Sequence, residues 1–473
     1  MKQSLQHISV ALVALAFVAF PLPAQERISP DDMPSQWAYA TGFDQTVPTD
    51  DAWWRSFGDT MLDSLIAIGV DRNYDIAMAS RRIEIARQGV RQARAAYYPS
   101  LSANAGWNRT RTSGAVASPE VDASTSSYFG LGIDMNWEID LFGKITARTR
   151  QGSATFKASR AQYAAMTVSV VSKIASAYMR LRTLQGERDV LREHISSQKR
   201  VVEITEARFE AGISSMLDVA QAKTTYLSTE ASITTLDTDI ATAINTIGVL
   251  TGMFPEQMHA MLDTPRPLPD YRQIVAVGVP MELLRRRPDV AEAEYTLAAD
   301  AAAVGIAKKD FLPTLSISGS IGTHAHKAGE LFSGPSFAYS VAPALSWTIF
   351  DGMARKAAVA SAREQMQAGV DNYNLTLLTA VQEVDNAMAQ YVNALRYIDL
   401  VEQVVEQAQK SFDLSIDLYK KGLSSFINVS DAQIARLQYA DELVSARGAA
   451  LSALVNLYQA LGGGWSIGQI SEK

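Results

Sequence analysis

The feature that most constrains this chain is its very long helical pattern. From Gly143 to Ala211 no proline interrupts the sequence, and one continuous helix over that range would be roughly 100 Å long at 1.5 Å per residue. A second stretch repeats apolar residues at spacings of three and four over about five heptads. Its seam consists of Leu377, Ala380, Val384, Ala387, Tyr391, Ala394, Ile398, Val401, Val405, Ala408 and Phe412. Two other stretches, 219–250 and 429–460, keep the same period, which only Arg436 breaks. Rods of this length predict coiled-coil hairpins, and a plain antiparallel coiled-coil pair would satisfy this pattern on its own.

Four shorter stretches alternate large apolar residues with small or polar ones, which is the period of a β-strand. In the clearest, 128–138, Phe129, Leu131, Ile133, Met135 and Trp137 alternate with Gly130, Gly132, Asp134, Asn136 and Glu138. Similar alternation covers 101–108, 315–322 and 337–349. The predicted fold class is therefore α+β, with four strands of roughly ten residues attached to very long helices.

The chain consists of two copies of one unit. ARFEAGISSMLDVAQA (207–222) aligns with DLYKKGLSSFINVSDA (417–432), which pairs Gly212 with Gly422 and Ser215 with Ser425. Each copy has the order helix, two strands, long helix, glycine turn and return helix. A period this long indicates duplication of a whole module rather than a solenoid repeat.

The division of the chain follows from these patterns. A Lys near the start, an apolar run from Ile8 to Phe20 and a small residue at Ala24 predict a secretory signal peptide. A retained membrane anchor fits less well, because a helical span needs roughly 20 residues. We predict a signal peptide at 1–24, an extended segment at 25–58, a first repeat at 59–260, an equatorial linker at 261–280, a second repeat at 281–465 and a tail at 466–473.

Composition excludes several classes of function. The net charge is −7, so no general basic character favours nucleic acid as a partner. The chain has no cysteine, which excludes disulfides, thiol catalysis and a lipid attached to cysteine. No Gly-rich phosphate loop, HExxH, GxSxG or close His-acid-nucleophile set occurs, and we predict a protein that is not an enzyme and needs no cofactor. His324 and His326 alone make a weak metal site, and we expect them in a solvated loop between two strands.

Four strands with one apolar face predict a sheet that cannot stay open in a membrane, because its edges would leave backbone groups without partners in hydrocarbon. Membrane barrels need about eight strands or more. Two chains would give a plugged barrel and three an open lumen, so a homotrimer is the simplest conduit. We expect the apolar face of 128–138 to meet lipid. The aromatic residues expected at the membrane interfaces are Tyr97, Tyr98, Trp107, Tyr128, Trp137, Trp347 and Phe350. A soluble sandwich, with two apolar faces packed together, is the alternative.

Six motifs in order carry a family likeness: WWRSFGD (53–59), ASRRIEIARQGVRQARAAYYPSL (79–101), WEIDLFGK (137–144), GVPMELLRRRPDVAEAE (278–294), YKKGLSSFINVSDAQ (419–433) and NLYQALGGGW (456–465). Together they resemble the outer-membrane efflux proteins, the TolC-like and OprM-like channels. The resemblance implies a homotrimeric exit duct. In it a β-barrel in the outer membrane of a Gram-negative bacterium is continued across the periplasm by an α-helical barrel, which works with a periplasmic adaptor and an inner-membrane pump. Many OprM-like members carry a lipid on an N-terminal cysteine, and this chain departs from them there.

The same resemblance assigns a gate to the hairpin tips. It identifies Tyr419 and Lys420 before Gly422, Ile427 as the apolar plug and Asp431 as a charged ring. Asp218 matches the position that hydrogen-bonds across to the tyrosine. Where TolC-like members have an arginine two residues after the glycine, this chain has Ser424, and the resemblance leaves Lys420 as a substitute.

Helix capping is an equal alternative for Asp218, because Ser215 to Asp218 fits the S-x-x-D capping pattern and an acid in a first turn complements the helix dipole. The two roles can coexist. The competing function for the whole chain is a soluble periplasmic coiled-coil adaptor. A general diffusion porin fits less well, because one chain of that class carries the strands of a whole barrel.

Overall fold

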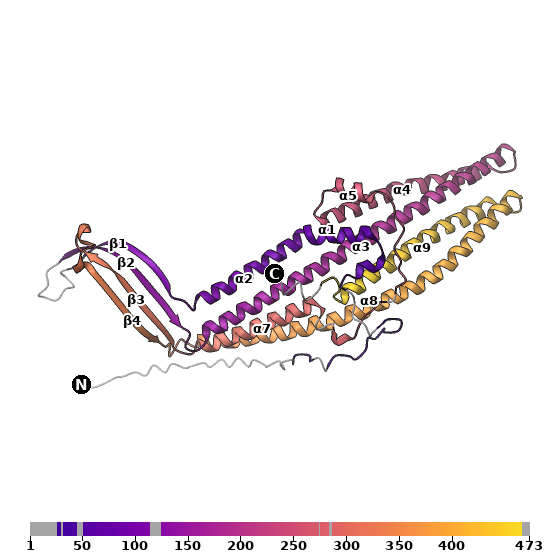
Figure 1. Ribbon diagram of the computed structural model, residues 1–473. Coiled ribbons are helices and arrows are strands. Elements are labelled where there is room, and N and C mark those ends of the chain that lie inside the picture. The colour runs from indigo at the N-terminus through magenta and orange to yellow at the C-terminus, as the bar shows by residue number, and fades with distance from the viewer. Residues whose placement is uncertain are drawn as a thin grey trace, which may run out of the picture.

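The computed structural model describes residues 26–29, 32–44, 51–113, 124–273, 275–282 and 286–465. The predicted signal peptide and C-terminal tail lie outside this range. The molecule is elongated, with the four strands at one end and two helical hairpin tips at the other (Figure 1). Its elements are α1 (Thr60–Arg72), α2 (Tyr74–Ala95), β1 (Ser100–Arg111), β2 (Thr125–Ile139), α3 (Lys144–Glu210), α4 (Met216–Thr251), α5 (Pro255–Leu262), α7 (Pro288–Lys309), β3 (Thr314–Ala325), β4 (Phe337–Ser346), α8 (Ala354–Lys420) and α9 (Phe426–Ala460).

The strands form one antiparallel sheet in the order β1-β2-β3-β4. The register places residues of one kind in rows across it. One row is Ala103, Ile133, Ile321 and Tyr339, and the next is Ser102, Asp134, Ser320 and Ser340. The predicted alternation is therefore confirmed. Tyr339 is 75% exposed and Ile321 50% exposed, so none of the described elements covers the apolar face, and a sandwich within the chain is excluded.

Helices α3 and α8 are both 67 residues long, or roughly 100 Å each. The rod predicted for 143–211 is confirmed, and α8 extends beyond both ends of the five heptads that predicted it. Each begins beside an aspartate that the sequence analysis did not single out. Asp140 accepts from the backbone N–H groups of Ile145 and Thr146 at 2.8 and 2.9 Å, and Asp351 accepts from Arg355 N at 3.2 Å. These carboxylates satisfy backbone donors that would otherwise have no partner at the start of each rod.

Residues of the predicted coiled-coil seam are buried between the helices. Leu377, Val384, Tyr391 and Ile398 of α8 are all at most 2% exposed. Arg436, which breaks the pattern in α9, places its guanidinium 5.0 Å from the centre of the Phe412 ring. Its alkyl stem and planar head thus occupy an apolar position without loss of charge.

The largest hydrophobic cluster lies at the middle of the molecule, where α1, α3, α5, α8 and α9 meet. Trp53 is 1% exposed and stacks on Tyr458 with ring centroids 4.9 Å apart. A Cβ at Gly463 would lie 2.8 Å from Trp53 Cδ1. This close approach explains why glycine stands at that position of the GGGW motif.

Two local expectations were wrong. The alternation was expected to continue to 349, but β4 ends at Ser346. His324 was expected in a loop, but it belongs to β3, opposite Gly130. Only His326 follows the strand, and its Nδ1 lies 2.7 Å from Ser127 O. A Cβ at Gly130 would lie 3.0 Å from His324 Nδ1, so the glycine leaves room for the imidazole at this end of the sheet. The alternation pattern alone does not reveal that.

Candidate functional site

The two hairpin tips share one backbone design. Helix α3 runs into α4 through Gly212, and α8 runs into α9 through Gly422. Both glycines have positive φ, 72° and 74°, in the left-handed region that glycine adopts without steric cost. Their N–H groups donate to Phe209 O at 2.9 Å and to Tyr419 O at 3.0 Å. The backbone therefore does not distinguish the tips, and any difference in function must come from side chains.

The first tip contains the predicted cap. Ser215 is the N-cap residue of α4, and its hydroxyl accepts from Asp218 N at 3.3 Å and donates to Asp218 Oδ1 at 2.9 Å. The second tip differs, because Ser425 makes no side-chain cap bond. Asn428 stands where the first repeat has Asp218, and its amide donates to Ser424 Oγ at 2.9 Å.

Tyr419 connects the two tips. It is 3% exposed, and its hydroxyl donates to Asp218 Oδ2 at 3.2 Å. Its ring meets Phe426 edge-on at 5.5 Å. Burial raises the pKa of the Tyr419 hydroxyl, and the neighbouring Asp218 carboxylate raises it further. The phenol therefore stays protonated and remains a hydrogen-bond donor to Asp218. The Asp218 carboxylate thus accepts from Ser215 of its own hairpin and from Tyr419 of the other.

Tyr419, Asp218 and Phe426 form a cluster at the tips that also contains a cation, Arg208, which the sequence did not predict. Its guanidinium lies 4.7 Å from the centre of the Tyr419 ring and donates to Lys420 O at 3.0 Å. Lys420 contributes this carbonyl, and its exposed ammonium forms no ion pair with any described residue. One signal could have found Arg208: the second repeat has Leu418 at the matching position. An arginine that replaces a leucine in one copy only indicates a contact specific to that copy.

The structure does not bring the predicted plug and charged ring into this cluster. Ile427 is 56% exposed, and Asp431 is exposed one turn further along α9. Both lie on the chain's surface close to the tip. Neither side chain is among the contacts of Tyr419 with Asp218, Phe426 and Arg208. Both side chains are exposed on α9.

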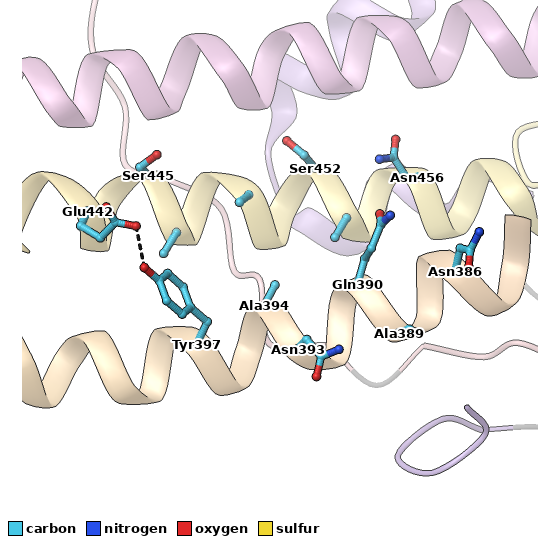
Figure 2. A pocket seen from close by; sticks show the side chains of 13 residues that line it. Asn386, Ala389, Gln390, Asn393, Ala394, Tyr397, Glu442, Ser445, Ser452 and Asn456 are labelled. Carbon is cyan, nitrogen blue, oxygen red and sulfur yellow. Dashed lines mark hydrogen bonds between the residues drawn. The ribbon is translucent and has the colours of Figure 1, made fainter. Parts of the chain in front are cut away.

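A groove of about 840 Å³ continues the Asp431 face of α9 toward the middle of the molecule. Gln438, Ser445 and Ser452 follow Asp431 at steps of seven residues, the interval that keeps side chains on one face of a coiled coil. Helix α8 forms the other wall with Asn386, Gln390 and Asn393, and Figure 2 shows the bond across the groove from Tyr397 to Glu442, 2.8 Å long. Apart from Glu442, the lining carries no charge.

The predicted aromatic residues lie at two levels of the sheet. Near the helices, the indole of Trp137 donates to Tyr97 O at 3.0 Å. Trp347, one residue past β4, donates to Phe311 O at 2.9 Å. At the far end, Trp107 faces Phe129 with centroids 6.4 Å apart, and Tyr128 meets His324 edge-on at 5.9 Å. The four rings thus bracket the strands at both ends.

Two features are absent from the residues that the structure describes. None of their helices combines the length and the apolar character that a transmembrane helix requires. No group of three or more His, Cys, Asp or Glu side chains in the same part of the chain is arranged to hold a metal ion.

Comparison with known proteins gives a consistent result. The model of the outer membrane efflux protein family matches residues 68–253 and 279–463. The pyoverdine export outer membrane protein OpmQ of Pseudomonas aeruginosa is 29% identical over 98% of this chain and 97% of its own length. The probable efflux pump outer membrane protein TtgC of Pseudomonas putida is 28% identical over 96% of both chains. The solved structure of the outer-membrane channel OprN covers 93% of this chain and 99% of its own, with a TM-score of 0.86 and 28% identity.

Proposed function

The chain belongs to the outer membrane efflux protein family and is an outer-membrane channel of a tripartite efflux or export system, and we propose that three copies close one conduit with a gate at the hairpin tips. The alternative of a soluble periplasmic adaptor is set aside, because relatives along nearly the whole chain are outer membrane proteins. The channel spans the outer membrane and extends into the periplasm.

The open edges of the sheet are the observation that carries the trimer. In the order β1-β2-β3-β4, the outer sides of β1 and β4 have no strand partner among the described residues. Unpaired strand edges are unfavourable in hydrocarbon, so β4 of one chain pairs with β1 of the next. Three chains close a twelve-stranded barrel, which is wide enough for a lumen. Native mass spectrometry in detergent should show three chains per particle, and any other number contradicts the proposal.

The groove between α8 and α9 is the proposed lumen wall at the middle of the conduit. The hydroxyl side chains of Ser445 and Ser452 lie on the same face of α9 as Asp431, and α8 adds the amides of Asn386, Gln390 and Asn393. A lining with little charge lets substrates of different charge pass without a deep binding site, which suits a passive duct. Rings of Ile427 and Asp431 from three chains would then narrow the lumen near the tip and favour cations there.

The resting gate is closed by the contacts of Tyr419 with Asp218 and Arg208. They join the second hairpin to the first, so opening requires that the second hairpin leave the first. The test is the double substitution Asp431→Ala with Tyr419→Phe, which should raise the single-channel conductance of the reconstituted trimer. The matched control changes the equivalent positions of the first repeat, Gln221→Ala with Phe209→Leu, and should leave conductance unchanged. Unchanged conductance in the first variant contradicts the gate.

The partners proposed are a periplasmic adaptor and an inner-membrane pump, supported by the tripartite systems to which the relatives belong. The proposed division keeps the extended segment 25–58, the repeats 59–260 and 281–465 and the equatorial linker 261–280. Co-purification of the channel with the adaptor and pump of its own bacterium tests the assembly, and isolation of the channel alone after chemical crosslinking in cells would contradict it.

A further inference from the structure

The ends of four helices next to the sheet are unusually basic. Segments 85–95, 144–160, 301–309 and 354–363 contain three, five, two and three Lys or Arg residues, and none of the four contains Asp or Glu. They belong to α2, α3, α7 and α8, whose ends meet the strands at one level of the molecule (Figure 1). The chain as a whole has a net charge of −7, so this concentration of positive charge is local. We refer to the cations of these segments as the junction collar.

Part of the junction collar is explained by the fold. Lys144 forms an ion pair with Asp310, and Lys309 Nζ donates to Gly143 O at 2.7 Å. Arg355 Nε donates to Asp351 at 2.6 Å. The contacts of Lys144 and Lys309 fasten the first repeat to the second where helices become strands, and Arg355 pairs within the second repeat. Together they engage two of the nearby carboxylates, Asp310 and Asp351.

Five other cations have no such role. Arg94, Arg148, Arg150, Lys308 and Lys356 are exposed and form no ion pair with a described residue. Lys356 also stands in the first turn of α8, where the helix dipole disfavours positive charge and where no acid is present. Arg94 and Lys308 lie in the last turns of α2 and α7, where the helix dipole favours positive charge, whereas no contact within the described part of one chain accounts for Arg148, Arg150 and Lys356.

An exposed apolar belt lies directly beside them. Tyr98, Phe142 and Phe350 are 74%, 40% and 80% exposed at the ends of the strands. Phe311, which is 44% exposed, belongs to the same belt, and the Arg355 guanidinium of the collar lies 5.4 Å from the centre of its ring. Aromatic rings at the edge of a hydrocarbon layer, followed by cations, are typical of a membrane–water interface.

We propose that the junction collar binds the headgroups of anionic phospholipids in the periplasm-facing leaflet of the outer membrane. The strands lie in the membrane and the helices extend into the periplasm, so the collar is level with the phosphates of that leaflet. The apolar belt contacts the acyl chains while the five unpaired cations attract the headgroups. Binding would fix the depth and tilt of the channel at the point where barrel and helices join.

The experiment uses the full-length channel in nanodiscs of phosphatidylethanolamine with a minor fraction of phosphatidylglycerol. Native mass spectrometry measures the lipids that stay bound when the disc is removed. Wild type should retain phosphatidylglycerol with an enrichment of about fivefold over the disc, the size expected for one cation near an anionic headgroup. Added sodium chloride should reduce the enrichment by screening. Inorganic phosphate at equal ionic strength should reduce it no further, which separates a lipid site from a general phosphate site.

The variant is Arg94→Gln with Arg148→Gln, Arg150→Gln and Lys356→Gln, and it should lose the enrichment. The matched control removes four exposed cations far from the sheet, Lys199→Gln, Arg200→Gln, Arg396→Gln and Lys410→Gln, and should keep it. If the fourfold variant does not assemble, the pair Arg148→Gln with Arg150→Gln should give a partial loss. Equal enrichment in the variant and wild type overturns the proposal. A changed ion selectivity of the channel with unchanged lipid retention also overturns it, because the cations would then face the lumen.

Discussion

The two hairpins of this molecule have the same backbone and different chemistry at corresponding positions. Helices α3 and α8 have equal length, and their turns contain glycines with almost the same φ. Yet the first tip supplies the arginine and carboxylate, Arg208 and Asp218, while the second supplies the tyrosine, Tyr419, that contacts both. Duplication thus produced two similar rods, and later divergence made them complementary. The turns are alike, so we infer that contacts between the repeats set the resting position of the tips.

The largest effect is expected from Arg208→Ala. The substitution removes a cation–π contact and a hydrogen bond, together worth about 2 kcal/mol at each tip, or roughly thirtyfold in the ratio of open to closed tips. Single-channel recording should show higher conductance or longer open times. Leu418→Ala, the matching change in the second repeat, should leave both unchanged, and equal effects of the two changes would remove the proposed asymmetry.

A second contrast lies further along the same helices. Burial raises the pKa of Glu187 to about 7 from 4.5, Asp441 and Asp239 raise it as well, and Arg180 opposes the shift. The matching residue of the second repeat is Tyr397, which donates to Glu442 at 2.8 Å. A carboxyl whose pKa is higher in the folded state favours the protonated form there, so its charge lowers stability increasingly as the pH rises from 4.5 to about 7.

Glu187→Gln should therefore raise the melting temperature of the channel by several degrees at pH 8, and the gain should vanish near pH 4.5. Differential scanning calorimetry at both pH values measures it. Tyr397→Phe breaks a bond at an exposed site and should change stability by only about 0.5 kcal/mol, with little dependence on pH. A stability gain for Glu187→Gln that is the same at both pH values would refute the role of its charge.

The smallest effect concerns the caps. Ser215 caps α4 through its hydroxyl, whereas Ser425 makes no such bond. Ser215→Ala should cost about 1 kcal/mol of stability and Ser425→Ala only a few tenths. Chemical denaturation of the two variants compares them directly, and equal losses would show that the tips do not differ in capping.

Features that depend on local periodicity could be predicted from the sequence. The alternation in 128–138 identified β2 and its two faces, the heptads identified the buried line from Leu377 to Phe412, and Ser215 with Asp218 identified a cap. Each of these patterns repeats within a few residues, so a single stretch carries enough information to reveal it.

Contacts between distant residues could not be predicted in the same way. Arg208 meets Tyr419 across 211 positions of sequence, and nothing local distinguishes it from other charged residues on a helix surface. Asp140 and Asp351 bind backbone donors several residues ahead, after turns whose shape alternation does not specify. The early end of β4 at Ser346 likewise depends on the turn into α8 rather than on the apolar pattern.

The most direct test of the central claim links the two tips reversibly. The chain has no cysteine, so Asp218→Cys with Tyr419→Cys introduces the only two thiols, one on each side of the hydrogen bond. The double variant should conduct more than wild type, and a short bifunctional thiosulfonate should return the conductance to the wild-type value until a reductant cleaves the bridge. If bridging is complete and the conductance stays high, the link between Tyr419 and Asp218 does not hold the channel closed.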